Sequence, residues 1–260
     1  MMALTGERAR KLIKALIEDT AAEPAVRWTV KRSRGIRMPY DLVKNEIYDR
    51  QAAAAMERVL GSRSNCIDIG SHNGEFLKVF LRLAPEGRHF AFEPIPQLAQ
   101  ALKANFPSVE VLDIALADRP GEATFYVLPD APALSGLSRR DFVRPHEARK
   151  EIKVRTESLD AAIPRNVPIA LIKLDVEGAE GLVLSGAIDT IRRCRPYIVF
   201  EHGRRSSQAF GYAPEAIYEM LVDRCALRIS LLPEWLARGR ALTKREFVRS
   251  AEWYFLAHPD

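Results

Sequence analysis

The sequence is poor in cysteine, and its few cysteines stand alone. Cys66, Cys194 and Cys225 are the only three in 260 residues, and no CxxC pair or Cys/His spacing accompanies them. This excludes a disulfide framework and a structural zinc site as organising features. Isolated thiols are typical of a reducing compartment, so we expect a cytoplasmic protein.

A long hydrophobic run is also missing. Charged residues interrupt residues 1–20 throughout, which excludes the apolar centre of a signal peptide, and no later run could cross a bilayer. We therefore expect no membrane insertion. Hydrophobic residues make up 47% and charged residues 28% of the chain, as in ordinary globular proteins.

Charge of one sign is scarce as well, because the formal net charge is only +5. Basic residues are interleaved with acids except at 30–37 and 138–150, so we expect no nucleic-acid partner. Solvated loops explain these two clusters, and attraction of an anionic substrate is the alternative. Nothing in the composition decides for or against a homo-oligomer.

Apolar residues recur at helical spacing within residues 4–17 and 41–60, and this predicts N-terminal helices. Strand-like and helix-like segments then alternate along the chain. We divide the protein into an N-terminal helical segment, residues 1–60, and a main domain, residues 61–260.

The main domain is predicted to be α/β, with a mostly parallel seven-stranded sheet and helices on both faces. Predicted strands cover 65–70, 88–94, 109–116, 169–175, 196–201, 226–232 and 251–259. Predicted helices cover 74–84, 96–106, 180–194 and 214–224. Short strands at 122–128 and 151–159 flank an irregular loop, interpreted as disordered or as an active-site lid. We expect seven strands in the main sheet.

Polar residues follow the first two strands of this domain. Asp68, Gly70 and Gly74 follow the first strand, and Glu93 ends the second roughly 20 residues later. Ligands of such sheets bind outside the carboxyl ends of the strands, where a carboxylate can accept ribose hydroxyls. The pattern predicts a nucleoside cofactor; a tight turn beside a solvated acid is the alternative.

The dinucleotide fingerprint is not matched here. It would need glycines where His72 and Glu75 stand. A bulky His72 would block a pyrophosphate, and the charge of Glu75 would repel it. NAD and an oxidoreductase are therefore disfavoured. S-adenosylmethionine, which carries a cationic sulfonium and no phosphate, suits an acidic site better.

Several motifs together resemble the FkbM-type methyltransferase family over residues 45–203. They are "CIDIGSHNGEF", "FAFEPIP", "LDIALADRPGEATFYV", "ESLD", "ALIKLDVEGAEGLVLSGA" and "RPYIVFEHG". The resemblance implies a class I Rossmann-like fold and S-adenosylmethionine-dependent methylation, commonly of a hydroxyl oxygen. The acceptor would be a small molecule or a glycan.

The resemblance also implies roles for individual residues. The methionine part of the cofactor would be surrounded by Asp68, Gly70, Ser71, His72, Asn73 and Gly74. Glu93 would bind the ribose, and Asp113 and Ala115 would lie near the adenine. Within 128–150 the family places serines, which only Ser135 and Ser138 match. We expect 128–150 and 203–212 to shape the acceptor pocket.

Three carboxylates follow the strand at 169–175, and the methylation of an alcohol requires a base. Residues at the ends of the fourth and fifth strands, which should be neighbours, supply the candidates: Asp175, Glu177, Glu201 and His202. Lys173 lies on the same strand face as Asp175. Glu177 and Glu180 can instead stabilise the start of the next helix.

The choice among these bases stays open at this point. Asp175 is the first candidate because it closes an apolar strand, whereas His202 has an ordinary pKa near neutrality. A divalent metal between Asp175 and Glu201 is compatible with the residues, although no ligand spacing indicates one. A non-catalytic binding protein that keeps the fold is the remaining alternative.

Overall fold

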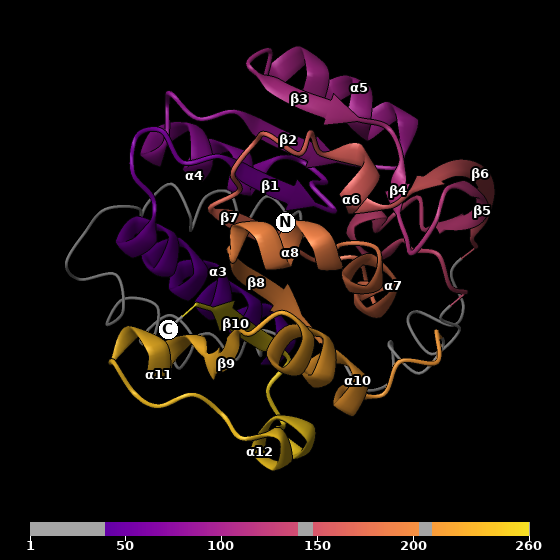
Figure 1. Cartoon of the computed structure of the whole chain (residues 1–260). Helices are drawn as coiled ribbons and strands as arrows, with labels where there is room; N and C mark the ends of the chain where they lie inside the picture. Colours follow the sequence, from indigo (N-terminus) through magenta and orange to yellow (C-terminus); the bar gives the residue numbers. More distant parts are fainter. Residues whose placement is uncertain (1–39, 140–147, 203–209, 260) are drawn as a thin grey trace, which may run out of the picture. The chain divides into compact units, whose positions relative to one another are not determined.

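The computed structural model describes residues 40–139, 148–202 and 210–259 (Figure 1). By its contacts the chain divides into two units, residues 1–47 and 48–260. The predicted helix at 41–60 is confirmed as α3 (Tyr40–Val59). The helix predicted within 4–17 lies outside the described residues. The domain boundary at residue 60 stays a prediction.

The second unit is built on a seven-stranded sheet, as the sequence predicts. Its order is β3 (Val109–Leu112), β2 (His89–Phe92), β1 (Cys66–Ile69), β7 (Leu171–Leu174), β8 (Tyr197–Glu201), β10 (Tyr254–His258) and β9 (Arg228–Leu231). The first five strands are parallel to their neighbours, and β10 runs antiparallel to both β8 and β9. The fourth and fifth predicted strands, β7 and β8, are neighbours.

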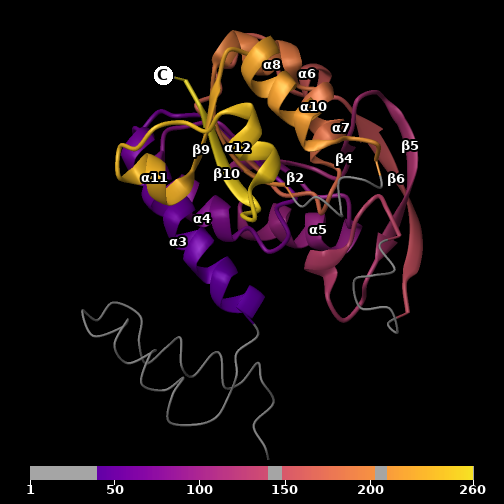
Figure 2. The same cartoon turned by 90° about the horizontal axis from the view of Figure 1, so that it is seen from below.

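Helices cover both faces of this sheet (Figure 2). One face packs against α4 (Glu75–Leu83), α5 (Pro96–Asn105), α11 (Leu232–Leu236) and the part of α3 from Tyr48 onward. The other face packs against α6 (Leu159–Ala162), α7 (Glu180–Ser185), α8 (Ile188–Cys194), α10 (Pro214–Tyr218), η2 (Glu219–Arg224) and α12 (Lys244–Arg249). Because helices cover both faces of the sheet, its strands are nearly continuous apolar runs.

Period-two alternation assigns each strand residue to one of the two faces. Ile67, Ile172 and Phe200 contribute to the core under α7 and α8. Their neighbours Cys66 and Leu171 contribute to the core under α3 and α4. On β1 and β7 the charged residues of this face, Asp68 and Lys173, lie near the carboxyl edge of the sheet, where the candidate site lies.

A second sheet of three strands contains the two short strands predicted at 122–128 and 151–159, so ten strands occur in the described residues. It is formed by β4 (Ala115–Leu116), β6 (Lys150–Glu157) and β5 (Gly121–Val127). The single strand expected at 109–116 is wrong, because the chain leaves the main sheet at Asp113 and pairs with β6 from Ala115 onward. The η1 turn (Pro132–Leu134) follows β5.

The helix expected at 180–194 is also interrupted, at Gly186. The chain turns at this residue, between α7 and α8. A Cβ atom at Gly186 would lie 2.2 Å from the Ala117 carbonyl oxygen, so a side chain is excluded at this turn. The helix expected at 214–224 is confirmed as α10 followed by the wider π-helical turns of η2. No described helix combines the length and apolar character that a bilayer crossing needs.

Candidate active site at the carboxyl edge of the sheet

A cleft of about 540 Å³, counting its space open to solvent, lies at the carboxyl ends of β1, β2 and β7. Its walls are the glycine turn after β1, the segment after β2, β4, the η1 region and the turn after β7. The cleft lies where ligands of open α/β sheets bind.

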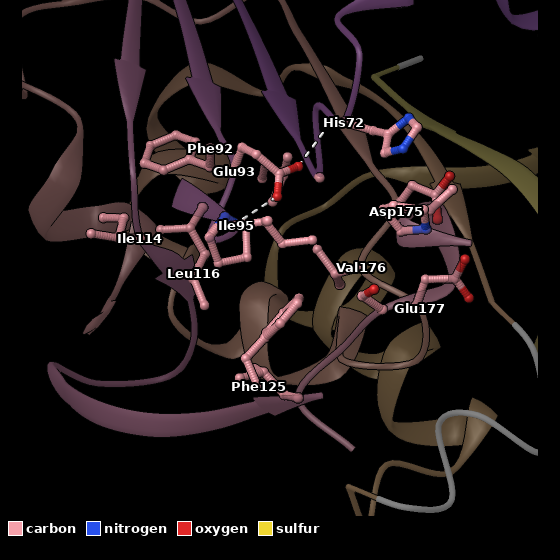
Figure 3. Close-up of a pocket in the computed structure, with 18 residues that line it drawn as sticks. His72, Phe92, Glu93, Ile95, Ile114, Leu116, Phe125, Asp175, Val176 and Glu177 are labelled. Carbon is pink, nitrogen blue, oxygen red and sulfur yellow. Dashed lines mark hydrogen bonds between the residues drawn. The ribbon is translucent and has the colours of Figure 1, made fainter. Parts of the chain in front are cut away.

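The two ends of the cleft differ in polarity (Figure 3). Phe92, Ile114 and Leu116 line one end, which is apolar. His72, Asp175 and Glu177 gather at the other end. A flat apolar group and a charged reaction centre would therefore occupy different ends of the same cleft.

The glycine turn after β1 touches the turn after β7. Gly70 adopts a left-handed φ of 78°, and a Cβ atom there would lie 1.9 Å from the Asp175 carbonyl oxygen. Only glycine fits this approach. The backbone N–H of Asp175 also donates to the Ile69 carbonyl oxygen at 3.1 Å. The two turns are thus held together by backbone contacts.

Glu93 is buried beside this turn, with 4% of its surface exposed. Its two carboxylate oxygens accept the backbone N–H groups of His72, at 2.9 Å, and Ile95, at 3.0 Å (Figure 3). Burial raises the pKa of Glu93, although these two hydrogen bonds oppose the rise. Each oxygen keeps a further lone pair that a ligand hydroxyl can use.

Asp68 and Lys173 form a buried ion pair on the adjacent strands β1 and β7. The ammonium nitrogen of Lys173 lies 3.9 Å from Oδ1 of Asp68, and 1% of Asp68 is exposed. Neither carboxylate oxygen of Asp68 has a hydrogen-bond partner among the described residues. Burial raises the pKa of Asp68 to about 6, against the charge of Lys173.

Asp175 is surrounded by groups that favour its charged form. Oδ2 of Asp175 lies 3.4 Å from the Lys173 ammonium and accepts the Tyr254 hydroxyl at 3.0 Å. A further hydrogen bond joins its carboxyl group to that of Glu201. Burial alone would raise the pKa of Asp175, but Lys173, Glu201 and Tyr254 outweigh burial and hold the pKa below its ordinary value. Its side chain is 22% exposed, on the cleft.

The other predicted acids have distinct surroundings. Burial and the charge of Asp175 raise the pKa of Glu201 well above its ordinary value. Glu177 lines the cleft with a left-handed φ of 59°, a conformation that is uncommon outside glycine. Glu180 begins α7, and its carboxylate accepts the backbone N–H groups of Val176 and Gly178. Glu180 is thus the buried anchor of the turn, and burial raises its pKa to about 7.

His202 is not brought into this group. It follows Glu201, so alternation along β8 directs it to the opposite sheet face, where its ring stacks on Phe247 with centroids 5.6 Å apart. Its backbone N–H donates to the Trp253 carbonyl oxygen. Of the predicted base candidates, the structure therefore gathers Asp175, Glu177 and Glu201 with Lys173.

The predicted cofactor residues separate into two sets. Gly70, His72, Glu93 and Ala115 line the cleft. Behind it lie Asp68, Ser71 and Gly74, which are buried, and outside it lie Asn73 and Asp113, which are exposed. Ser71 donates to the Asp68 carbonyl oxygen, and Asp113 pairs with Lys103.

One argument made from the sequence is wrong in its detail. Glu75 does not face the cleft, because its side chain is exposed on α4 and pairs with Lys78 at 3.0 Å. Repulsion of a pyrophosphate by Glu75 therefore does not operate. His72 does line the cleft, with a left-handed φ of 46°.

The loop expected to form a lid contributes directly to the cleft. Pro132, Ser135 and Leu137 line it, and the Ser135 hydroxyl accepts the Leu128 backbone N–H at 3.0 Å. Ser138 does not line it. Residues 140–147 and 203–209, which include much of the predicted acceptor pocket, lie outside the described residues.

Tyr254 is the polar contact that sequence reasoning missed. The motif "AEWYFLAHP" predicts a strand but not its neighbour, and only the antiparallel pairing of β10 with β8 places Tyr254 opposite Glu201. The apolar wall formed by Ile114, Leu116 and Phe125 was missed because two sheets meet there. Across the described ranges, no three or more His, Cys, Asp or Glu side chains are grouped to hold a metal ion.

Comparison with known proteins identifies the family of this site. Residues 68–229 match the family model described as the methyltransferase FkbM domain. The 2-O-methyltransferase NoeI of Sinorhizobium fredii is 29% identical over 220 residues, which cover 78% of this chain and 82% of NoeI.

Two solved structures are also similar. Methyltransferase FkbM from Methylobacillus flagellatus has 16% identity and a TM-score of 0.48; the match covers 76% of this chain and 44% of that one. This chain thus spans less than half of that crystallised chain. A TehB-like S-adenosylmethionine-dependent methyltransferase from Corynebacterium glutamicum has 13% identity and a TM-score of 0.43, over 90% and 94% of the two chains.

The family match extends over more than half of the 260 residues. It confirms the fold class and the methyltransferase activity predicted from the sequence, and it favours methyl transfer over hydride transfer. The family implies S-adenosylmethionine as methyl donor. This chain belongs to the FkbM methyltransferase family.

Proposed function

We propose that the enzyme methylates a hydroxyl oxygen of a small or carbohydrate-like acceptor, with Asp175 as the group that accepts the hydroxyl proton. The observation that carries this proposal is the geometry of Asp175, a charged carboxylate that borders the cleft while its cation, Lys173, is buried behind it. The relative named as a 2-O-methyltransferase supports oxygen as the nucleophile.

The cleft has the features that S-adenosylmethionine requires. Glu93 offers free lone pairs to ribose hydroxyls, and Ile114, Ala115 and Leu116 offer an apolar wall to the adenine. Asp68, whose buried carboxylate oxygens have no hydrogen-bond partner in the described part of the chain, favours a cationic group near the glycine turn. When bound, S-adenosylmethionine supplies an electrophilic methyl group on a cationic sulfonium.

Asp175 has a defined part in the chemistry. The acceptor hydroxyl would lose its proton to the Asp175 carboxylate while its oxygen takes the methyl group. The bond between oxygen and hydrogen and the bond between the methyl carbon and the donor sulfur would break as the bond between oxygen and carbon forms, and the sulfur would leave as a neutral thioether. Lys173 keeps Asp175 ionised before transfer, because its ammonium lies 3.4 Å away. A positioned base of this kind contributes roughly 10²–10⁴-fold to the rate.

Two other carboxylates, Glu201 and Glu177, have supporting roles. Glu201 donates a hydrogen bond to Asp175 and is therefore protonated, because two carboxylates cannot share a hydrogen bond without a proton. Glu177 borders the acceptor side of the reaction centre.

A cytoplasmic location is proposed on the free state of the cysteines.

Transfer of a labelled methyl group tests this function. The purified chain is incubated with S-adenosyl-[methyl-¹⁴C]methionine and a panel of methyl glycosides, amines and carboxylic acids, and calorimetry measures the binding of S-adenosylmethionine and of NAD. We expect S-adenosylmethionine to bind, NAD not to bind, and label to appear in a glycoside ether. Label only in amines would overturn the proposal of oxygen as nucleophile.

A further inference from the structure

Tyr254 connects the C-terminal strand to the reaction centre. It lies on β10 opposite Glu201 of β8, and its hydroxyl donates to Oδ2 of Asp175 at 3.0 Å. Only 8% of Tyr254 is exposed. Burial and the charge of Asp175 raise the pKa of Tyr254 well above its ordinary value, so the phenol keeps its proton and remains a donor.

The ring of Tyr254 is fixed by its neighbours. It stacks on the ring of Tyr48 with centroids 4.8 Å apart and an interplanar angle of 27°. Tyr48 in turn contacts the edge of Trp253 at 5.9 Å, and its hydroxyl donates to the carboxylate of Glu252. A buried ring stacked on a ring that is itself held in place has few rotamers available, so its hydroxyl has a fixed direction.

The groups around Asp175 come from every element packed against it. They are Asp68 from β1, His72 from the glycine turn, Lys173 from β7, Glu177 and Glu180 from the following turn and helix, Glu201 from β8, and Tyr254 from β10. Asp49 of α3 acts on Lys173 and Tyr254 from a distance. Lys173, Glu201 and Tyr254 are the three that donate a hydrogen bond to Asp175 or pair with it.

We propose that Tyr254 is a positioning residue for methyl transfer, which fixes the orientation of the Asp175 carboxylate and stabilises its charged form. This inference rests on the proposed role of Asp175 as proton acceptor. Tyr254 does not touch the cleft itself. It acts through Oδ2 of Asp175, so the last strand of the chain becomes part of the catalytic machinery.

The proposal has a physical consequence for the pH dependence of the reaction. A hydrogen bond donated to a carboxylate favours its ionised form, so losing the bond raises the carboxyl pKa. Activity that requires ionised Asp175 is lost as pH falls through that pKa. Loss of the Tyr254 hydroxyl should therefore move the acidic limb of the rate profile to higher pH, by about one unit for one charge-assisted hydrogen bond.

Tyr254→Phe tests the proposal, because it removes the hydroxyl and keeps the ring. The control is Tyr197→Phe, which removes a hydroxyl at the amino end of β8, the opposite end of that strand from Glu201. Methyl transfer is measured from pH 3 to 9 with the glycoside that is best in the panel. For Tyr254→Phe we expect about tenfold lower kcat at neutral pH, the shifted acidic limb and S-adenosylmethionine affinity within about twofold of wild type. Tyr197→Phe should match wild type.

A double-mutant cycle separates this role from a merely structural one. In an Asp175→Asn background Tyr254→Phe should cost almost nothing further, since the two residues act as one unit. Equal costs of Tyr254→Phe in both backgrounds would overturn the positioning role. If Asp175→Asn itself keeps wild-type turnover, the proposed function fails; if only Tyr254→Phe is silent, the further inference alone fails.

A second variant keeps the test valid if Tyr254→Phe unfolds. Site-specific 3-fluorotyrosine at position 254 keeps the hydroxyl and nearly the same size, while its more acidic phenol is a stronger donor. The acidic limb should then move to lower pH, opposite to the expected shift in Tyr254→Phe. An acidic limb that coincides with the wild-type limb in this variant would contradict the proposal.

Discussion

Asp68 and Asp175 have the same side chain and occupy neighbouring parallel strands, yet their surroundings are opposite. Both lie on the sheet face of Lys173, which is 3.9 Å from one and 3.4 Å from the other. Among the described residues, neither carboxylate oxygen of Asp68 has a hydrogen-bond partner within normal distance, and burial raises the pKa of Asp68 to about 6. Asp175 receives hydrogen bonds from two side chains, and its pKa is lowered.

The difference shows that partners, rather than residue type or strand position, decide in which direction the pKa of each aspartate is shifted. Both are desolvated, but Tyr254 and Glu201 donate only to Asp175. A carboxylate that must accept a proton from an alcohol has to be ionised and reachable, and Asp175 satisfies both conditions. Asp68 is fully buried, so it suits a static electrostatic role.

The largest expected effect comes from removing Lys173, the cation that Asp68 and Asp175 share. Lys173→Met leaves both carboxylates without their ammonium, and removing one partner of a buried ion pair costs about 3–5 kcal/mol. Urea denaturation at pH 7 and pH 5 measures the free energy of unfolding. The decrease caused by Lys173→Met should be smaller at pH 5, because carboxylates become protonated there. Lys78→Met is the control, because its pair with Glu75 is exposed. A loss under about 1 kcal/mol would show that the pair stabilises nothing.

The second effect concerns the contact between the two strand ends. Gly70→Ala places a Cβ atom 1.9 Å from the Asp175 carbonyl oxygen, whereas Gly211→Ala has a similar φ, 74°, and no atom within 4 Å. Both variants carry left-handed strain, so their difference isolates the close approach. We expect Gly70→Ala to cost about 1–3 kcal/mol more in thermal and urea unfolding. Equal stability of the two variants would mean that the turns separate without penalty.

A smaller effect concerns cofactor binding at the next strand. Glu93→Ala removes a carboxylate that organises the glycine turn through His72 and is proposed to bind the ribose. We expect S-adenosylmethionine affinity in calorimetry to fall about tenfold or more, since hydrogen bonds to charged groups contribute about 1.5–3 kcal/mol each. Glu110→Ala, which removes an exposed partner of Arg88, is the control. Unchanged affinity in folded Glu93→Ala would remove Glu93 from the cofactor site.

The smallest expected effect concerns Asp68 and the pH dependence of the free energy of unfolding. Because the pKa of Asp68 is about 6 in the folded protein, against an ordinary value of 3.8, the folded state binds more protons between these values. The free energy of unfolding therefore falls as pH rises from about 4 to 6. Asp68→Asn should make this fall shallower in urea titrations, while the contribution of Glu180, whose pKa is about 7, remains. If the free energy of unfolding of Asp68→Asn depended on pH as it does in wild type, the proton taken up below pH 6 would not be on Asp68.

Much of the fold follows from the sequence, because apolar strands and helical periods alternate regularly after residue 60. The pairing of β7 with β8 and the shared face of Lys173 and Asp175 are confirmed, since both depend on local periodicity. The break at Asp113 was not predictable, because β4 pairs with β6, which lies about forty residues further along the chain. Local pattern carries no information on such a partner.

The site is less predictable than the fold, for the same physical reason. Strand ends identify Asp68, Glu93 and Asp175, but the direction in which each pKa is shifted depends on contacts between distant segments. Tyr254 reaches Asp175 only through the antiparallel register of the last strand. Glu75 was placed in the cleft from its spacing alone, and the helical turn of α4 instead directs it to solvent.

The most direct test of the central claim is methyl transfer by Asp175→Asn measured beside Asp68→Asn and wild type, in single turnovers with labelled S-adenosylmethionine and the best glycoside acceptor. Asparagine keeps the size of Asp175 and one acceptor oxygen, and removes its charge and basicity. We predict a loss of roughly 10²–10⁴-fold for Asp175→Asn, with cofactor affinity nearly unchanged, and a much smaller loss for Asp68→Asn. Near-wild-type transfer by Asp175→Asn, with Glu201→Gln inactive instead, would contradict the account.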